Sequence, residues 1–308
     1  MKELLKGTGA ARILSGEVRR GRENHAYLLV FEDGKYLRFA LRTFAAILYG
    51  GDARKTSLIE RESFADCKMY PREGEKLSAE DAADIVSESV IRPLEGEKKL
   101  FVIDGFQTAN AATQNKLLKV LEEPPQGVCF LLGATGVHAI LPTVLSRVTR
   151  LEIPRFSQEQ TERFLARKYP ESSPAQRRES AAISGGVPSV AEEFLGGGEY
   201  AECLALALRA AECERGEFPE VALKAAALGA KESFLAVWKA VYRDMLARLL
   251  GQDAVLSRGA KRNRHTAASL VAAIDLISEA ENEVKLNANY RQAVEILLAR
   301  IEKEKTRW

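Results

Sequence analysis

Short apolar runs alternate with helical segments along the first half of the chain. Apolar residues recur at helical spacing over 39–48 and 110–121, and Ser78 with Asp81 three residues later predicts the start of a further helix. Strands that alternate with helices predict a parallel sheet covered by helices. The apolar runs have the length of buried strands, and they cover residues 27–31, 66–70, 100–103, 128–132 and 148–153.

The pattern changes after Pro154, where the strand signals end and helical spacing continues. Ser157 opens a capping-box pattern that predicts a helix start, and the glycine pair at 185–186 predicts a break between helices. Three consecutive glycines at 196–198 predict a hinge. We therefore expect an α/β domain over 1–155, a small helical domain over 156–198 and an all-α domain over 199–308.

Two apolar stripes at helical spacing lie in the segment 199–308. Such stripes usually form a core, and we interpret both in this way. The alternative is that part of a stripe packs against partner subunits. The stripes consist of Phe234, Trp238, Val241, Tyr242, Met245 and Leu249, and of Tyr290, Val294, Leu297, Leu298 and Ile301.

The composition is that of an ordinary globular protein. Of the 308 residues, 46% are hydrophobic and 29% are charged, and the net charge is +2. A net charge this small does not produce the overall positive electrostatic field that favours tight DNA binding. The chain has no run of about 18 apolar residues and no signal-like N-terminus, so we expect a cytoplasmic protein that meets no membrane.

The cysteines and the basic clusters predict neither a metal site nor a nucleic-acid site. The four cysteines, at 67, 129, 203 and 213, form no C-x-x-C pair, so we expect reduced, buried thiols and no metal site. Basic clusters at 19–22 and 261–265 lack interleaved aromatic residues. We interpret both clusters as solvated faces and assign no nucleic-acid site.

The segment 100–147 carries the candidate chemistry. Its first strand ends in Asp104, a helix follows, and the segment closes on Ser146-Arg147. Residues 115–125 read N-K-L-L-K-V-L-E-E-P-P and residues 141–147 read L-P-T-V-L-S-R. These runs resemble N-A-L-L-K-T-L-E-E-P-P and L-P-x-T-I-L-S-R-C of AAA+ clamp-loader subunits. The resemblance implies a RecA-like AAA+ domain over 1–155, a helical lid over 156–198 and a helical collar for oligomerisation over 199–308.

The position of the phosphate-binding loop departs from this family. The lead-in 25–29, H-A-Y-L-L, matches, but only Gly34 and Lys35 remain of the pattern G-x-x-x-x-G-K-[ST]. Acids at 32–33 place negative charge where such a loop offers backbone N–H groups to phosphate. Tyr36 replaces the magnesium-binding hydroxyl. We interpret Gly34-Lys35 as a turn without phosphate-binding function.

Two further positions that the resemblance assigns to nucleotide chemistry have changed. Asp104 stands at the magnesium-linked acid of the Walker B strand, but Gly105 replaces the catalytic glutamate that orients water. Val190 stands where relatives carry a nucleotide-sensing arginine. Three independent losses predict a subunit that hydrolyses no ATP and holds no cofactor. Asp104 then remains as a structural acceptor at a strand end.

Arg147 matches the arginine that clamp-loader relatives extend to the ATP of a neighbouring subunit. Arginine suits this task because it is always charged and offers a planar fork to phosphate oxygens. The alternative is an exposed arginine that pairs with a local acid. The surrounding motif favours the trans arginine finger.

The resemblance points to the delta prime class of subunits, accessory parts of a DNA-directed DNA polymerase holoenzyme. It implies a hetero-oligomer with gamma/tau ATPase subunits and a delta subunit, which loads the sliding clamp onto primed DNA. Two alternatives stay open. One is an ATP-hydrolysing gamma/tau-type subunit with an unusual phosphate loop, and the other is a degenerate AAA+ adaptor outside replication.

Overall fold

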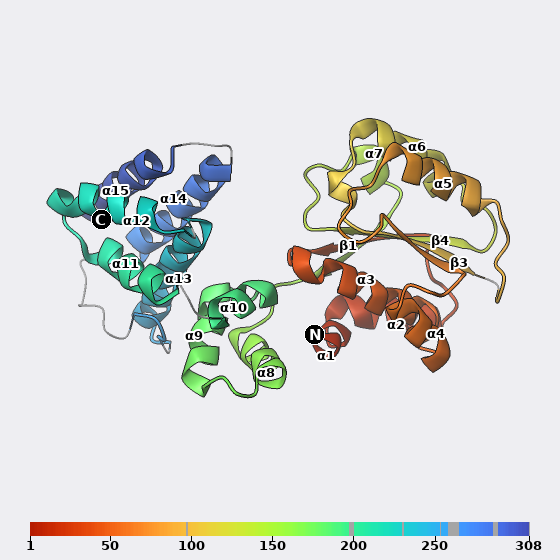
Figure 1. Cartoon of the computed structure of the whole chain (residues 1–308), viewed down its shortest axis with the longest axis horizontal. Helices are drawn as coiled ribbons and strands as arrows, with labels where there is room; N and C mark the ends of the chain where they lie inside the picture. The colour runs from red at the N-terminus through yellow and green to blue at the C-terminus, as the bar shows by residue number, and fades with distance from the viewer. Residues whose placement is uncertain are drawn as a thin grey trace. The chain divides into compact units, whose positions relative to one another are not determined.

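The computed structural model describes residues 1–96, 98–196, 200–229, 231–252, 254–257, 265–285 and 289–307. The chain forms two compact units, Met1–Arg155 and Phe156–Trp308. Figure 1 shows the first unit as a sheet with helices and the second as helices alone. The division between the units falls where the strand signals of the sequence end.

The first unit is built on a five-stranded sheet in the order β2-β3-β4-β1-β5. Every pair of neighbouring strands is parallel. The expected parallel sheet is therefore confirmed, and each apolar run matches one strand to within two residues at either end. The strands are β1 (Ala26–Phe31), β2 (Cys67–Tyr70), β3 (Lys99–Ile103), β4 (Val128–Ala134) and β5 (Thr149–Ile153).

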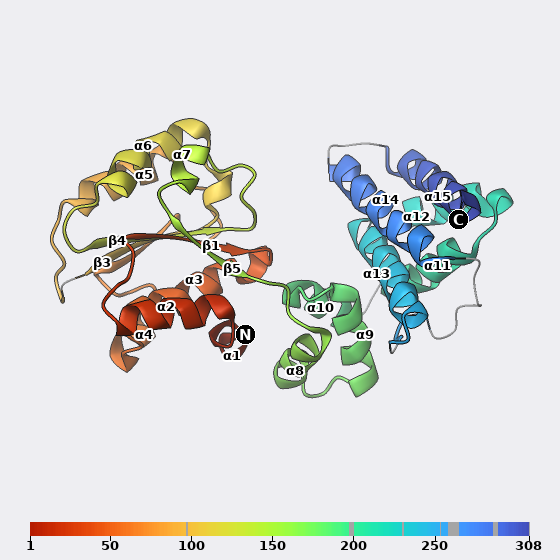
Figure 2. The same cartoon turned by 180° about the vertical axis from the view of Figure 1, so that it is seen from behind.

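Helices cover both faces of this sheet. Helices α1 to α4 lie on one face and α5 to α7 on the other, as the two opposite views agree (Figures 1 and 2). All residues of β3 and β4 are buried, because strands covered on both faces are removed from water at every position. The helices are α1 (Lys2–Lys6), α2 (Gly9–Arg19), α3 (Gly34–Leu48), α4 (Ala53–Glu60), α5 (Ala79–Ser89), α6 (Ala111–Glu122) and α7 (Pro142–Leu145).

Side-chain caps fix where the helices of this unit begin. Ser78 and Asp81 form the expected capping box of α5. Asn110 caps α6 by accepting the Thr113 N–H at 2.8 Å. Helix α3 begins at Gly34, earlier than the pattern over 39–48 indicated, because the Asp33 carboxylate accepts a backbone N–H of its first turn.

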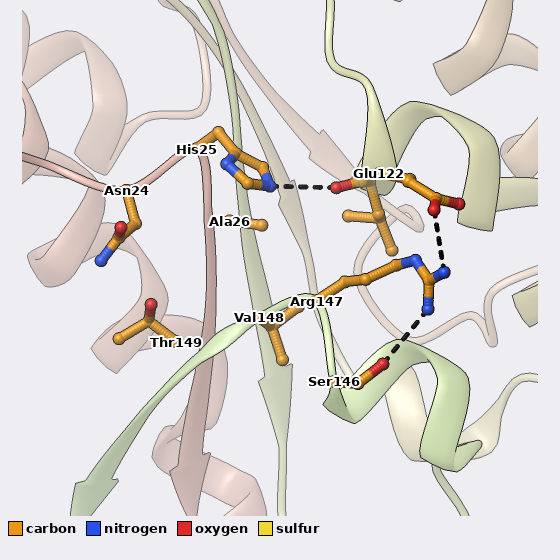
Figure 3. Close-up of a pocket in the computed structure, with 9 residues that line it drawn as sticks. Asn24, His25, Ala26, Glu122, Ser146, Arg147, Val148 and Thr149 are labelled. Carbon is orange, nitrogen blue, oxygen red and sulfur yellow. Dashed lines mark hydrogen bonds and ion pairs between the residues drawn. The ribbon is translucent and has the colours of Figure 1, made fainter.

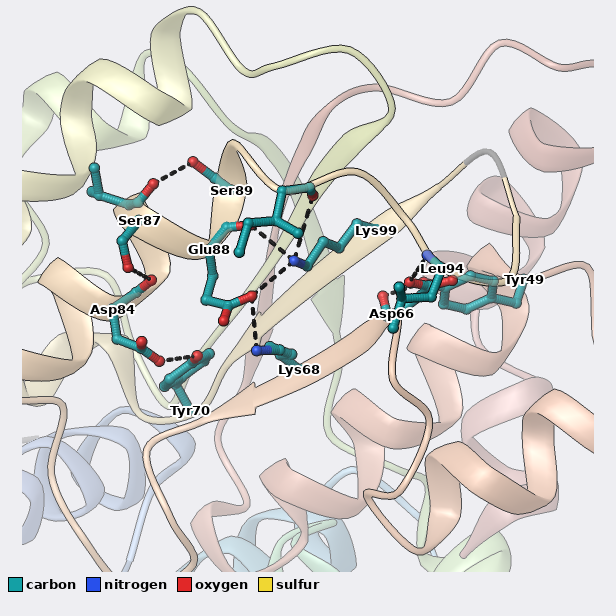
Figure 4. Close-up of polar contacts among 12 residues, drawn as sticks. Tyr49, Asp66, Lys68, Tyr70, Asp84, Ser87, Glu88, Ser89, Leu94 and Lys99 are labelled. Atoms are coloured by element: carbon teal, nitrogen blue, oxygen red, sulfur yellow. Dashed lines mark hydrogen bonds and ion pairs between the residues drawn. The ribbon is translucent and has the colours of Figure 1, made fainter.

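Buried polar groups hold the connection between α5 and β3 (Figure 4). The amine of Lys99 donates to the Glu88 carbonyl at 2.8 Å and to the Glu88 carboxylate at 2.9 Å, at the carboxyl end of α5. The buried Asp66 carboxylate accepts the N–H groups of Leu94 and Glu95, both at 2.7 Å. Lys99 of β3 therefore holds the end of α5, and Asp66, which precedes β2, holds the middle of the connection.

The second unit contains only helices among its described residues. Ser157 caps α8 through the expected capping box, and Gly185 ends α9 in a left-handed conformation with φ of 58°. Gly185 thus forms the break that the glycine pair predicted. The helices are α8 (Gln158–Lys168), α9 (Pro174–Ser184), α10 (Pro188–Leu195), α11 (Tyr200–Glu212), α12 (Phe218–Ala227), α13 (Lys231–Leu249), α14 (Ala267–Lys285) and α15 (Tyr290–Arg307).

The two apolar stripes form much of the core of this unit. Every residue of the α15 stripe and all but one residue of the α13 stripe are buried in a single cluster. The exception is Leu249, which is 51% exposed, so the prediction of core is wrong there. Leu249 is the last residue of α13, where the chain leaves the bundle. The division into a lid over 156–198 and a collar over 199–308 stays a prediction.

The state of the cysteines, metal-ligand clusters and membrane-spanning helices can be given only for the part of the chain that the structure describes. Within the described segments, the four cysteines are free and buried, and no group of His, Cys, Asp and Glu side chains could hold a metal ion. No described helix is long and apolar enough to cross a membrane. Residues 197–198 of the glycine run and 261–264 of the second basic cluster lie outside the described residues.

His265 makes the stability of the second unit depend on pH. Burial lowers the pKa of His265 from 6.5 to about 4, because the charged form is desolvated. The unfolded chain binds a proton at this site between about pH 6.5 and 4, and the folded chain does not. We expect the free energy of unfolding to fall by on the order of 2 kcal/mol from pH 7 to pH 4.

Urea unfolding of the second unit, followed at several pH values, measures this loss. His265→Gln is the control, since glutamine can donate to the Ala211 carbonyl that His265 Nε2 approaches at 3.4 Å but does not titrate. The variant should lose clearly less stability over the same pH range. An equal loss in both proteins would assign the pH dependence to other groups.

Candidate functional site

The position of the phosphate loop is filled by an acid of the chain itself. Only Glu32 and Asp33 connect β1 to α3. Asp33 is buried, and its carboxylate accepts the Tyr36 N–H at 3.2 Å. A helix N-terminus binds phosphate through its unsatisfied N–H groups and its positive dipole, and the Asp33 carboxylate takes that place here. Glu32 instead forms a surface ion pair with Arg155 (Nε to Oε2, 2.7 Å).

Gly34 and Lys35 lie in the first turn of α3. The interpretation of these two residues as a turn is therefore wrong, since the cap provided by Asp33 draws them into the helix. The connection between β1 and α3 is too short to form a loop around a phosphate chain.

An internal guanidinium occupies the neighbourhood of Asp104 at the carboxyl end of β3. Arg38 Nη1 lies 3.5 Å from Asp104 Oδ2, and it donates to the Pro71 carbonyl at 3.1 Å. The other edge of Arg38 binds Glu62 through two bonds, from Nε at 2.7 Å and from Nη2 at 2.6 Å. Asp104 is thus a structural acceptor for a cation of its own chain.

Electrostatics agrees with this arrangement. Burial raises the pKa of Asp104, and the positive charge of Arg38 partly offsets that rise. Burial opposes the charged form of Arg38, but the bonds that Arg38 donates to Glu62 and the negative charges of Glu62 and Asp104 outweigh burial and raise the Arg38 pKa. A magnesium ion at Asp104 would have to displace a guanidinium that already neutralises this carboxylate.

The sequence reasoning missed Arg38 and Glu62. A signal was present, because Arg38 stands between Leu37 and Ala40 on the apolar face of a helix, where a charged side chain needs a buried partner. Glu62 has a φ of 53°, which is unusual for a residue other than glycine. No sequence pattern identifies Glu62 as that partner.

The remaining two nucleotide positions have other roles. Gly105 has a φ of 62°, and its carbonyl accepts the Thr108 hydroxyl at 2.7 Å, so this residue forms a tight turn. A glutamate there would adopt a left-handed backbone conformation at a cost of about 1–2 kcal/mol. Val190 belongs to α10 and packs against the core of the second unit.

Arg147 lies between α7 and β5, at the edge of a surface pocket of about 530 Å³ (Figure 3). Its Nη1 donates to the Thr143 carbonyl at 2.8 Å and to Ser146 Oγ at 3.1 Å. Its Nη2 donates to Glu122 Oε1 at 3.0 Å. The Arg147 side chain is 30% exposed and that of Glu122 is 57% exposed.

Three segments that are distant in sequence meet in this pocket. They are residues 24–26, which lead into β1 and include its first residue, the end of α6, and residues 146–149. His25 Nε2 lies 3.0 Å from the carbonyl oxygen of Leu121, which joins the first two segments. The structure thus brings together three runs whose sequences resemble clamp-loader motifs: H-A-Y-L-L, L-E-E-P-P and L-S-R.

Arg147 lies at the opposite edge of the sheet from the filled nucleotide position. Thr149 pairs with Tyr27 near the start of β1, whereas Asp33 follows the end of the same strand. A strand of six residues, at about 3.3 Å each, separates these edges by about 20 Å. Arg147 therefore cannot act on a nucleotide at its own chain's phosphate position.

Comparison with known proteins agrees with these local resemblances. Residues 7–157 match the family described as DNA polymerase III, delta subunit. The delta' subunit of DNA polymerase III from Pseudomonas aeruginosa is 28% identical over 190 residues, which cover 58% of each chain. Residues 7–157 of this chain belong to the AAA+ clamp-loader family. The expected family and fold class are thereby confirmed.

Another relative matches over a shorter stretch of its own length. The tau/gamma subunit from Haemophilus influenzae is 28% identical over 162 residues, or 50% of this chain and 23% of that one. The chain therefore spans between about a quarter and three fifths of the curated relatives it matches first. Among solved structures, a gamma subunit-related protein from Thermotoga maritima aligns over 95% of this chain and 99% of its own, at 17% identity and with a TM-score of 0.48.

Proposed function

We propose that this clamp-loader family member is a delta prime-type subunit of a bacterial DNA polymerase III clamp loader. In this role it hydrolyses no ATP and supplies Arg147 to the nucleotide of a neighbouring subunit. One observation carries the proposal. The family's finger position is kept at one edge of the sheet, while internal side chains fill the nucleotide position at the other edge.

The proposed partners are gamma/tau-type ATPase subunits and a delta subunit, in a hetero-oligomer that places the sliding clamp on primed DNA. Relatives named tau/gamma and delta' support this choice. We propose that residues 156–198 serve as the lid and 199–308 as the collar that joins the ring. A pull-down with identification of the captured subunits separates this role from that of an AAA+ adaptor outside replication.

The isolated protein should not bind Mg-ATP in the micromolar range. Asp33 and the Arg38–Asp104 pair fill the places of phosphate and magnesium. The carboxylates of Glu32 and Asp33 would also repel a polyphosphate by about 1–4 kcal/mol each at surface dielectric values. Isothermal titration calorimetry measures the binding. Low-micromolar affinity that Lys35→Ala abolishes would contradict the proposal and favour the gamma/tau-type alternative.

A further inference from the structure

The guanidinium of Arg147 is engaged by its own chain in a way that limits its access to a phosphate. Both contacts of Nη1 go to the preceding turn, at Thr143 and Ser146. The contact of Nη2 goes to the carboxylate of Glu122. In the described chain, Nε is buried and has no hydrogen-bond partner.

This arrangement turns one anion-binding edge of the guanidinium inward. Carboxylate and phosphate bind arginine most strongly through two parallel bonds, and the edge formed by Nε and Nη2 can donate such a pair. Nε is inaccessible here, and the adjoining Nη2 already has an acidic partner. The side chain must therefore rotate away from Glu122 before it offers this edge to a phosphate of another subunit.

We propose that Glu122 is a positioning residue that holds Arg147 in a docked state, from which the neighbouring subunit's phosphate displaces it. The inference rests on the proposed role of Arg147 in trans. The carboxylate of Glu122 is an anion that accepts a hydrogen bond from Arg147 Nη2, as a phosphate of the neighbouring subunit would. Glu122 is the last residue of α6 and lines the pocket.

The pair is weak enough to be exchanged. Both side chains are partly exposed, and exposed ion pairs contribute about 0.2–1 kcal/mol. A phosphate group carries more negative charge than a carboxylate and can accept two bonds from the guanidinium. Glu122 therefore competes with the neighbouring subunit's phosphate for Arg147 and lowers the rate at the neighbouring site only modestly.

The test uses the full-length chain in the reconstituted complex with its ATPase, delta, clamp and primed-DNA partners. Glu122→Gln removes the charge and keeps the shape of the side chain. We expect steady-state phosphate release at the neighbouring site to rise by up to about fivefold, the factor that corresponds to the ion pair. Glu123→Gln is the matched control, because it removes the adjacent charge of the same motif and should leave the rate unchanged.

Two readouts distinguish docking from a structural role of Glu122. The double variant with Glu122→Gln and Arg147→Ala should hydrolyse ATP no faster than Arg147→Ala alone, because Glu122 acts only through the guanidinium. The advantage of Glu122→Gln over the wild type should also shrink with rising salt, since salt screens an exposed ion pair.

A rate for Glu122→Gln that is unchanged or lower than the wild type, with Arg147→Ala impaired and assembly normal, would overturn the docking proposal alone. A rise that persists in the Arg147→Ala background would overturn it as well. An unchanged rate for Arg147→Ala by itself would instead remove the proposed finger, and docking with it. Size-exclusion chromatography of each complex provides the assembly control.

Discussion

Replacing Arg147 by alanine should slow ATP hydrolysis by the assembled complex and leave the fold of this chain intact. Removal of one preorganised donor from a charge-developing site costs about 10²- to 10³-fold, and arginine fingers supplied in trans contribute about 10³- to 10⁵-fold in other phosphoryl-transfer systems. Only the site that faces this chain should lose its finger. Total hydrolysis by the ring should therefore fall partially, and clamp loading should slow with it.

The stability cost of Arg147→Ala should be small. Its contacts with Glu122, Thr143 and Ser146 lie at the surface, and a partly exposed ion pair contributes less than about 1 kcal/mol. Arg147→Lys should recover only part of the rate, because an ammonium group lacks the planar fork.

A nearby arginine provides the control for this prediction. Arg150 lies three residues further along, in β5, and forms a surface ion pair with Glu152. Arg150→Ala should leave ATP hydrolysis unchanged. Steady-state ATPase and clamp-loading assays on the reconstituted complex make the comparison. Normal rates for Arg147→Ala in a correctly assembled complex would leave this chain a purely structural subunit.

Replacing Arg38 by methionine should destabilise the first unit without creating an ATP site. The Arg38 side chain is 9% exposed and serves Glu62 and Asp104 together, so its loss leaves two carboxylates without their cation. Removal of one partner from a buried ion pair costs about 3–5 kcal/mol. Both carboxylates keep some exposure, so we expect a loss of about 2–4 kcal/mol in the free energy of unfolding.

Arg42→Met is the matched control, because Arg42 lies one turn further along α3 and meets the same Glu62 carboxylate at a longer distance of 3.5 Å. Its removal should cost less than about 1 kcal/mol. Urea unfolding measures both losses, and calorimetry with Mg-ATP accompanies it. Equal losses for the two variants would contradict the central role of Arg38. Micromolar ATP binding by Arg38→Met would show that Arg38 alone blocks the nucleotide position.

The sequence by itself determined the five strands of the first unit and the family. The apolar runs at 100–103 and 128–132 predicted β3 and β4, because strands covered by helices on both faces must be apolar at nearly every position. Helix starts at Ser78 and Ser157 were equally clear, since a capping box satisfies backbone N–H groups from residues three apart. All of these signals are local.

Only the tertiary structure decided which charged groups meet. Arg38 reaches Asp104 across 66 residues of chain, and Arg147 reaches Glu122 across 25, so no spacing rule predicts either pair. The exposure of Leu249 depends in the same way on what surrounds that position. Side-chain pairing requires two positions to be close in space, and the packing of α3 and α6 against the sheet supplies that proximity. A local pattern fixes which elements form, and the assembled sheet fixes whether a charged residue within them has a partner.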